Sequence, residues 1–153
     1  MMETPLKAQS IIPRIDGIQR DVEKLKELAA LSLEDFENET NFVLAQYYLR
    51  RALEGVFHIG SHLLSRLSGN RSTAYKAIAL QLGESGVVEK QFAQTALKKM
   101  AGYRNRLTHF YADVTPKEIY SILQKNLGDF DVFLKAIREV MKHPENYGFS
   151  VEK

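Results

Sequence analysis

The chain has 153 residues, of which 44% are hydrophobic and 26% are charged, and its formal net charge is +2. This length and composition are typical of one globular domain with its own hydrophobic core. The sequence contains no cysteine, which excludes disulfides and any cysteine-ligated zinc or iron–sulfur centre. The small net charge does not by itself indicate a nucleic-acid-binding protein.

The N-terminal segment lacks the basic stretch and apolar run of a secretory signal. No apolar stretch approaches the ~20 residues that a membrane-spanning helix needs. We therefore expect a cytoplasmic protein with no membrane contact. Its charges are unevenly placed, with an acidic region at 16–39 and a basic one at 98–106. This pattern fits an RNA-contacting face beside a partner face, but on charge alone ordinary solvated helix faces are the favoured interpretation.

Apolar residues recur at three- and four-residue steps along nearly the whole chain, and no segment alternates as a strand would. Gly55 and Gly60 fall inside the longest predicted helix, where they could permit close helix packing or be neutral. The clearest helix start is Thr115, followed by Pro116 and by Glu118 as a capping box. The predicted helices span about 13–31, 41–67, 72–82 (capped by Ser72 or Asn70), 89–109 and 116–141.

These elements predict an all-α protein, an antiparallel bundle of four to five helices in a single domain. We expect the domain to cover residues 1–153, with its core at about 11–141. Pro144 and Gly148 indicate a frayed tail over 142–153. This architecture is common and specifies no function.

The densest group of chemically active side chains lies at residues 104–111, with the sequence Arg-Asn-Arg-Leu-Thr-His-Phe-Tyr. Arg104 carries a permanent charge on a planar fork that suits phosphate, and His109 can take or give a proton near neutral pH. On an ideal helix, at ~100° per residue, these two side chains stand about 140° apart. A cleft that uses both needs the helix to loosen near His109, or a second copy of the chain to supply its own motif.

Three neighbours complete this group. Asn105 lies one turn before His109 and could orient the imidazole by a hydrogen bond. Gly102 could clear space for a backbone or a substrate phosphate, or could be a packing contact. Tyr111 would share a face with Arg104 if the helix continued. An arginine and a histidine near a helix C-terminus are favourable on dipole grounds alone, so a purely structural role is the alternative.

The spacing Arg-x4-His-x-Tyr, with Asn after the Arg and a preceding Lys-Lys-Met-Ala-Gly-Tyr run, resembles the motif of HEPN-domain ribonuclease toxins of the HepT type. The resemblance extends from about Ile11 to Met141 in helix order and spacing. It implies a helical homodimer whose paired motifs line a shared cleft and cleave RNA, either tRNA or mRNA, with no metal or other cofactor. The expected products carry a 2′,3′-cyclic phosphate and a 5′-hydroxyl.

Carried over to this sequence, the resemblance implies that Arg104 holds the scissile phosphate and that His109 acts as general base or acid. Asn105 would orient His109 or contact phosphate. Tyr111 matches the tyrosine to which the family's partner, a minimal nucleotidyltransferase antitoxin, transfers AMP. The added charge and bulk would repel RNA, although the antitoxin could also act by masking. Without the resemblance, Tyr111 is better interpreted as a half-buried aromatic that closes the helix end.

Two alternatives to a ribonuclease remain at this stage. One is a catalytically silent HEPN-like bundle that binds a nucleotidyltransferase or a nucleotide, and the other is a purely structural helical dimer. His58 and His62, one turn apart and preceded by Glu54, could in principle form a metal-binding stripe, but they match neither the His-Glu-x-x-His motif nor the Glu-x-x-His motif of di-iron bundles. A packed or supporting role near the cleft is favoured for them, and no metal site is expected.

Overall fold

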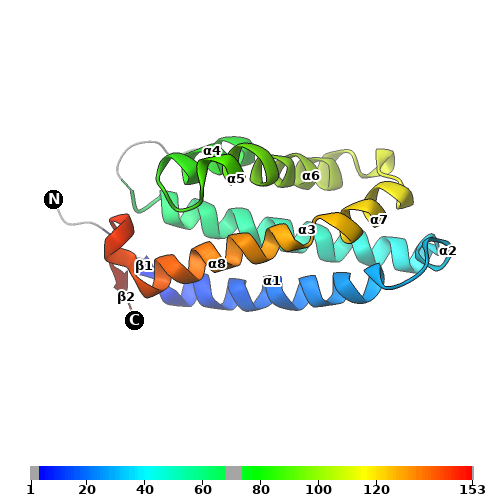
Figure 1. Cartoon of the computed structure of the whole chain (residues 1–153), viewed down its shortest axis with the longest axis horizontal. Coiled ribbons are helices and arrows are strands. Elements are labelled where there is room, and N and C mark those ends of the chain that lie inside the picture. Colours follow the sequence, from blue (N-terminus) through cyan, green and yellow to red (C-terminus); the bar gives the residue numbers. More distant parts are fainter. Residues whose placement is uncertain (1–3, 68–73, 153) are drawn as a thin grey trace.

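The structure, a computed structural model, describes residues 4–67 and 74–152. Its two longest helices, α1 (Ala8–Ala29) and α3 (Glu39–Leu64), lie antiparallel and make the most extensive contact in the fold. The short helix α2 (Leu33–Phe36) joins them, and α7 (Pro116–Lys125) and α8 (Gly128–Lys142) run alongside (Figure 1). The predicted all-α helical bundle is confirmed.

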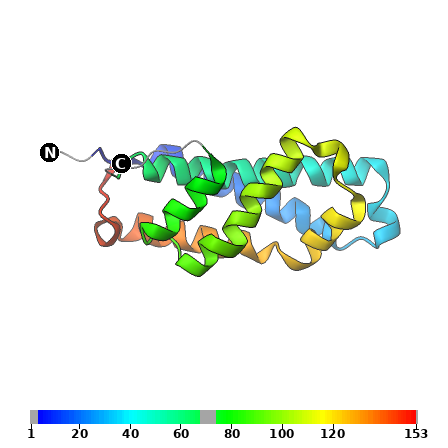
Figure 2. The same ribbon diagram turned by 90° about the horizontal axis from the view of Figure 1, so that it is seen from above.

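A second layer covers α3 on the side away from α1 (Figures 1 and 2). It consists of α4 (Tyr75–Glu84) and a continuous helical run from Lys90 to His109. This run comprises α5 (Lys90–Phe92), a π-helical segment η1 (Ala93–Leu97) and α6 (Lys98–His109). The single helix predicted over 89–109 is therefore confirmed, with one wider turn inside it.

Helix α1 begins at Ala8, and the predicted start at Pro13 is wrong. Pro13 lies inside the helix, where it removes one backbone hydrogen bond. The preceding turn is stabilised instead by packing, because Ile11 is fully buried and Leu6 is buried just before the helix. The free energy gained by burying these apolar side chains outweighs the cost of placing a proline inside the helix.

The predicted last helix over 116–141 is in fact two helices. Helix α7 ends at Lys125, Asn126 leaves the helical conformation at φ −121° and ψ 0°, and α8 begins at Gly128. Asparagine and glycine both weaken a helix interior, while the apolar spacing continues across the break. Buried Leu123 and Phe130 keep both halves against the same core. The capping box at Thr115 is confirmed, since its Oγ1 accepts a hydrogen bond from Glu118 N at 3.2 Å.

The expectation of no strand and a frayed tail is wrong. Strand β1 (Leu6–Lys7) pairs in parallel with β2 (Val151–Glu152), with Leu6 opposite Val151. Between α8 and β2 lies a 3-10 helix, η3 (Pro144–Tyr147), after which Gly148 turns the chain at φ 80°. The buried side chain of Phe149 anchors this segment. Two-residue strands carry no alternating pattern that a sequence could reveal.

The two glycines inside α3 permit close helix contacts. A Cβ at Gly55 would lie 2.8 Å from Ile18 Cγ1 of α1, and one at Gly60 would lie 2.9 Å from Leu82 Cδ1 of α4. Both distances are too short for a side chain without rearrangement, so the close-packing interpretation is confirmed. Helix α3 ends at Leu64, short of the predicted Leu67. The predicted caps Asn70 and Ser72 lie outside the described residues.

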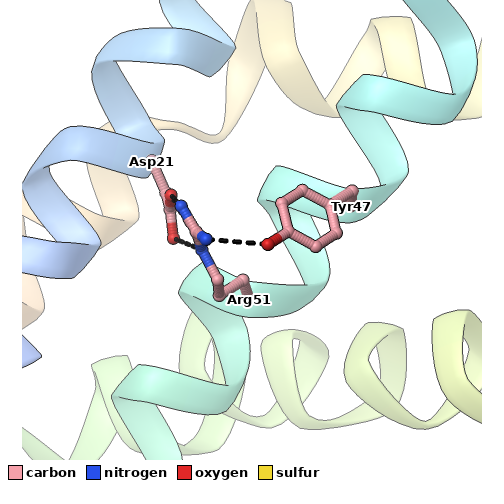
Figure 3. Close-up of polar contacts among 3 residues, drawn as sticks. All are labelled: Asp21, Tyr47 and Arg51. Atoms are coloured by element: carbon pink, nitrogen blue, oxygen red, sulfur yellow. Dashed lines mark hydrogen bonds and ion pairs between the residues drawn. The ribbon is translucent and has the colours of Figure 1, made fainter. Parts of the chain in front are cut away.

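Helices α1 and α3 are also joined by one buried charge. Asp21 is the buried charged residue among those the structure describes, and it accepts hydrogen bonds from Arg51 Nε at 2.9 and 3.1 Å. Arg51 Nη1 donates to Tyr47 Oη at 2.8 Å (Figure 3). In the described ranges, no helix has both the length and the apolar character needed to cross a membrane.

Candidate functional site

The motif occupies the end of α6. Phe110 N donates to Arg106 O at 2.8 Å, so α-helical geometry persists as far as His109. Phe110 then leaves the helix at φ −132°, and Tyr111–Asp113 forms a 3-10 turn, η2. The proposed loosening near His109 is therefore wrong, and Arg104 and His109 remain on different faces of one helix. Tyr111 lies beyond the helix and not on the face of Arg104.

Arg104 is held by aromatic rings. Its guanidinium carbon lies 4.3 Å from the centroid of the Tyr75 ring, and Tyr75 stacks on Phe57 at 4.8 Å with an interplanar angle of 17°. Phe57 is fully buried in α3, which gives this stack a fixed base. Arg104 forms no ion pair with any described residue, and its buried Nε has no hydrogen-bond partner there. Its position is thus fixed while its charge stays unneutralised.

Arg106, two residues further along, has the opposite environment. Its Nη1 forms an ion pair with Glu118 of α7, and its guanidinium lies 5.6 Å from the Tyr103 ring centroid. Burial first, and the nearby Glu118 second, raise the pKa of Tyr103. Arg106 therefore links α6 to α7, and its charge is neutralised by Glu118.

His109 is exposed at the end of α6, and its ring contacts the ring of Phe110 edge-on at 6.5 Å. Asn105 is partly buried one turn earlier, but no hydrogen bond joins it to His109 in the described part of the chain. The orienting role of Asn105 stays a prediction. Gly102 is not required by packing, since the nearest heavy atom to a Cβ there would be Lys76 Cε at 4.0 Å.

The side chains after the helix face solvent. Tyr111 is 65% exposed and Phe110 is 58% exposed. The interpretation of Tyr111 as a half-buried aromatic that closes the helix end is therefore wrong. Its hydroxyl lies on an open surface two residues from His109, where another protein could reach it.

His58 and His62 have separate partners. Arg14 Nη1 of α1 lies 2.8 Å from His58 Nδ1, whereas Lys7 N donates to His62 Nε2 at 3.2 Å. Burial is the main cause that lowers the pKa of His58, followed by the charge of Arg14, with a smaller lowering by Arg104. His62 thus joins β1 to α3, while His58 lies within electrostatic reach of Arg104. Within the described ranges, no three His, Asp or Glu side chains gather as metal ligands would.

Sequence reasoning missed the contributions of Tyr75 and Arg14. Tyr75 lies at an apolar position of the helix predicted over 72–82, where an aromatic is usually a core residue. Arg14 is one of many exposed arginines. Tyr75 contacts Arg104 and Arg14 contacts His58 through tertiary packing, so no spacing along the chain identifies them.

Comparison with known proteins shows the family of this chain. A sequence model of the family described as ribonuclease HepT-like matches residues 18–137, well over half of the chain. The tRNA nuclease HepT of Aphanizomenon flos-aquae (strain 2012/KM1/D3) is 22% identical over 139 residues, which cover 90% of this chain and 94% of that relative.

Solved structures share the fold. The tri-AMPylated Shewanella oneidensis HEPN toxin, in complex with its MNT antitoxin, has a TM-score of 0.76 and 22% identity over 84% of this chain and 96% of its own. YutE from Bacillus subtilis, a cytosolic protein of unknown function, has a TM-score of 0.74 and 18% identity over 92% of this chain and 95% of its own. Because the family model matches residues 18–137 and the fold agrees with it, the chain belongs to the ribonuclease HepT-like family.

Proposed function

We propose that this protein is the toxin of a two-gene toxin–antitoxin system and that it is a metal-independent endoribonuclease. The observation that carries the proposal is Arg104, whose guanidinium is fixed on Tyr75 and left without a carboxylate partner among the described residues, on the same helix as exposed His109. A phosphodiester requires a cation to hold it, and its cleavage requires a group that moves protons. The family supports ribonuclease activity.

The chemistry follows from these two side chains. His109 accepts the proton of a ribose 2′-hydroxyl, whose oxygen forms a bond to phosphorus while the bond from phosphorus to the 5′-oxygen breaks. Arg104 stabilises the negative charge that develops on the phosphoryl oxygens, and Asn105 contacts the same phosphate or His109. A protonated imidazole then gives a proton to the leaving 5′-oxygen. The products are a 2′,3′-cyclic phosphate and a 5′-hydroxyl.

The active species in this proposal is a homodimer. Arg104 and His109 lie about 140° apart on an unbroken helix, so one copy does not direct both at a single phosphate. Exposed apolar side chains, which often mark interfaces, occur in the first half of α3 and directly after α6. They are Val43 (53% exposed), Leu44 (38%), Tyr47 (43%), Phe110 (58%) and Tyr111 (65%).

Tyr111 is the proposed point of control. A nucleotidyltransferase antitoxin would join the α-phosphorus of ATP to the tyrosine oxygen and release pyrophosphate. The exposed hydroxyl supports such a transfer, and the Shewanella relative is described as tri-AMPylated and bound to an MNT antitoxin. The new phosphate places negative charge beside the cleft and repels RNA. If mass spectrometry of protein co-expressed with its antitoxin places no adenylyl group on Tyr111, this part is wrong.

The experiment that tests the nuclease is RNA cleavage in EDTA by protein whose intact mass shows no adenylylation. Transfer RNA is the first substrate, because the Aphanizomenon relative is named a tRNA nuclease. We expect cleavage with cyclic-phosphate ends, and His109→Ala should be slower by about 10²–10⁴-fold. Equal cleavage by both proteins would contradict the proposal. Absence of cleavage of tRNA and of total RNA would favour a silent module that binds a nucleotidyltransferase or nucleotide.

A further inference from the structure

Arg14 and His58 form a second group of polar side chains, where α1 contacts α3. Arg14 of α1 places Nη1 2.8 Å from Nδ1 of His58 of α3. Arg104 of α6 is close enough for its charge to lower the pKa of His58, after the larger effects of burial and of Arg14, with Glu54 opposing them. Helices α1 and α3 therefore bring Arg14 into contact with the His58 imidazole, and the charge of Arg104 on α6 acts on the same ring.

The geometry fixes which ring nitrogen of His58 carries the proton. A guanidinium group can only donate hydrogen bonds, so Nδ1 of His58 must accept from Arg14. The proton of the neutral ring then lies on Nε2. His58 therefore presents an N–H donor on its other side while Arg14 keeps its remaining N–H groups, and this combination suits an anion.

The groove that leads away from this pair retains positive charge. It runs between α1 and α3 with a volume of about 380 Å³, and two carboxylates line it. Asp21 is bound by Arg51 (Figure 3), and Glu54 is bound by Arg50 at 3.4 Å. The two other arginines of the groove, Arg14 and Arg20, form no ion pair with a described residue.

We propose that Arg14 and His58 form a phosphate-binding subsite that holds the RNA phosphate next to the one bound by Arg104. Arg14 donates through its planar fork to the phosphoryl oxygens, and His58 donates through Nε2. The groove between α1 and α3 then carries the strand away from the cleavage point. This subsite rests on the proposed function, because it needs RNA as the substrate of Arg104. A metal ion is disfavoured there by two neighbouring guanidinium charges.

The test compares Arg14→Gln with Arg138→Gln, using unadenylylated protein. Arg138 is exposed on α8 and forms no ion pair with a described residue, so both variants remove one charge from a helix surface. We expect Arg14→Gln to raise KM about tenfold with kcat nearly unchanged. For a 2′-O-methylated RNA, the slope of the logarithm of the binding constant against the logarithm of the salt concentration should also be shallower by about 0.7, because one phosphate contact is lost. Arg138→Gln should behave like wild type.

His58→Gln and Arg14→Lys sharpen the test. If Arg14 and His58 hold one phosphate, the double variant should raise KM by less than the product of the fold-increases caused by Arg14→Gln and by His58→Gln. Arg14→Lys, which keeps the charge but loses the fork, should have an intermediate KM. Circular dichroism confirms that each variant folds.

Several outcomes would overturn the subsite. Equal effects of Arg14→Gln and Arg138→Gln would show a response to net charge alone. A fall in kcat with unchanged KM in Arg14→Gln would place Arg14 in the chemical step. Binding of AMP or ATP through Arg14, with no loss of RNA affinity in Arg14→Gln, would assign the groove to a free nucleotide. Failure of the wild type to cleave any RNA is a different result, since it overturns the proposed function and the RNA subsite with it.

Discussion

Two arginines of this protein are held in place by opposite means. Arg51 of α3 lies between α1 and α3, where its guanidinium binds both oxygens of buried Asp21 and donates to Tyr47. The guanidinium carbon of Arg104 of α6 lies over the ring of Tyr75, which stacks on buried Phe57. An ion pair fixes a side chain and cancels its charge, whereas an aromatic face fixes it and leaves the charge available. The first arrangement stabilises the fold, and the second leaves a cation available for the substrate in the proposed function.

Replacement of Arg104 gives the largest effect expected from this comparison. Arg104→Ala should lower kcat/KM by about 10²–10³-fold, because it removes the group that stabilises charge on the phosphoryl oxygens. The free energy of unfolding should fall by only about 1 kcal/mol, the contribution of the cation–π contact with Tyr75, since Arg104 has no ion pair with a described residue and its buried Nε lacks a hydrogen bond. Cleavage kinetics and urea unfolding measure the two quantities. A stability loss as large as that of Arg51→Met would contradict the comparison.

Replacement of Arg51 should have the reverse effect. Arg51→Met leaves the buried carboxylate of Asp21 without its partner, which should lower the free energy of unfolding by about 1–3 kcal/mol. This range is below that of a fully buried pair, because the Arg51 side chain is 50% exposed and water can enter. The kcat for RNA should stay near wild type. Arg50→Met, which breaks the more exposed pair with Glu54, is the matched control and should cost less than about 0.5 kcal/mol.

The aromatic support of Arg104 can be removed separately. Tyr75→Leu should lower kcat/KM by about threefold to thirtyfold, the range of a partly desolvated cation–π contact. Tyr75→Phe keeps the ring and should retain activity close to wild type. Because Tyr75→Leu also loses the stack on Phe57, its unfolding temperature should be measured and the kinetics run well below it. Equal losses in the Phe and Leu variants would show that the ring does not position Arg104.

The smallest expected effect concerns pH. Burial is the first cause of the lowered pKa of both His58 and His62, so the unfolded chain takes up protons at these residues before the folded chain does. Stability should therefore be complete above the unfolded pKa of ~6.5 and should fall as the pH drops below it. Thermal unfolding between about pH 7.5 and pH 5.5 measures this loss, which should be smaller in the double variant His58→Gln, His62→Gln. An unchanged loss in that variant would show that other groups cause it.

Much of the fold could be predicted from the sequence, because apolar spacing reports directly on which face of a helix is buried. The helices around Val22, Leu53 and Phe133 are examples. The break at Asn126 could not be predicted, since the apolar spacing continues through it. The parallel pair of Leu6 and Val151 also left no signal, because its stability comes from contacts between residues far apart in the chain.

The candidate site was predictable to the extent that it is local. Arg104, His109 and Tyr111 follow one another at a recognisable spacing, so the sequence alone is enough to propose them, and their roles stay a prediction. The residues that give Arg104 its environment come from other helices, namely Tyr75 from α4 and His58 from α3. Glu118 of α7 forms an ion pair with Arg106 and not with Arg104. This pairing is established only when the helices pack together, so the sequence does not show which arginine is left unpaired.

The pairing of β1 with β2 has a practical consequence for experiments. It brings both ends of the described chain to one extremity of the bundle, while the end of α6 and the turn into α7 lie toward the other (Figure 1). A fluorescent label or an affinity handle attached at either end would therefore be remote from Tyr111. Labelled protein should report complex formation with an antitoxin without obstructing the tyrosine. A handle chosen for purification would likewise leave the surface around His109 open.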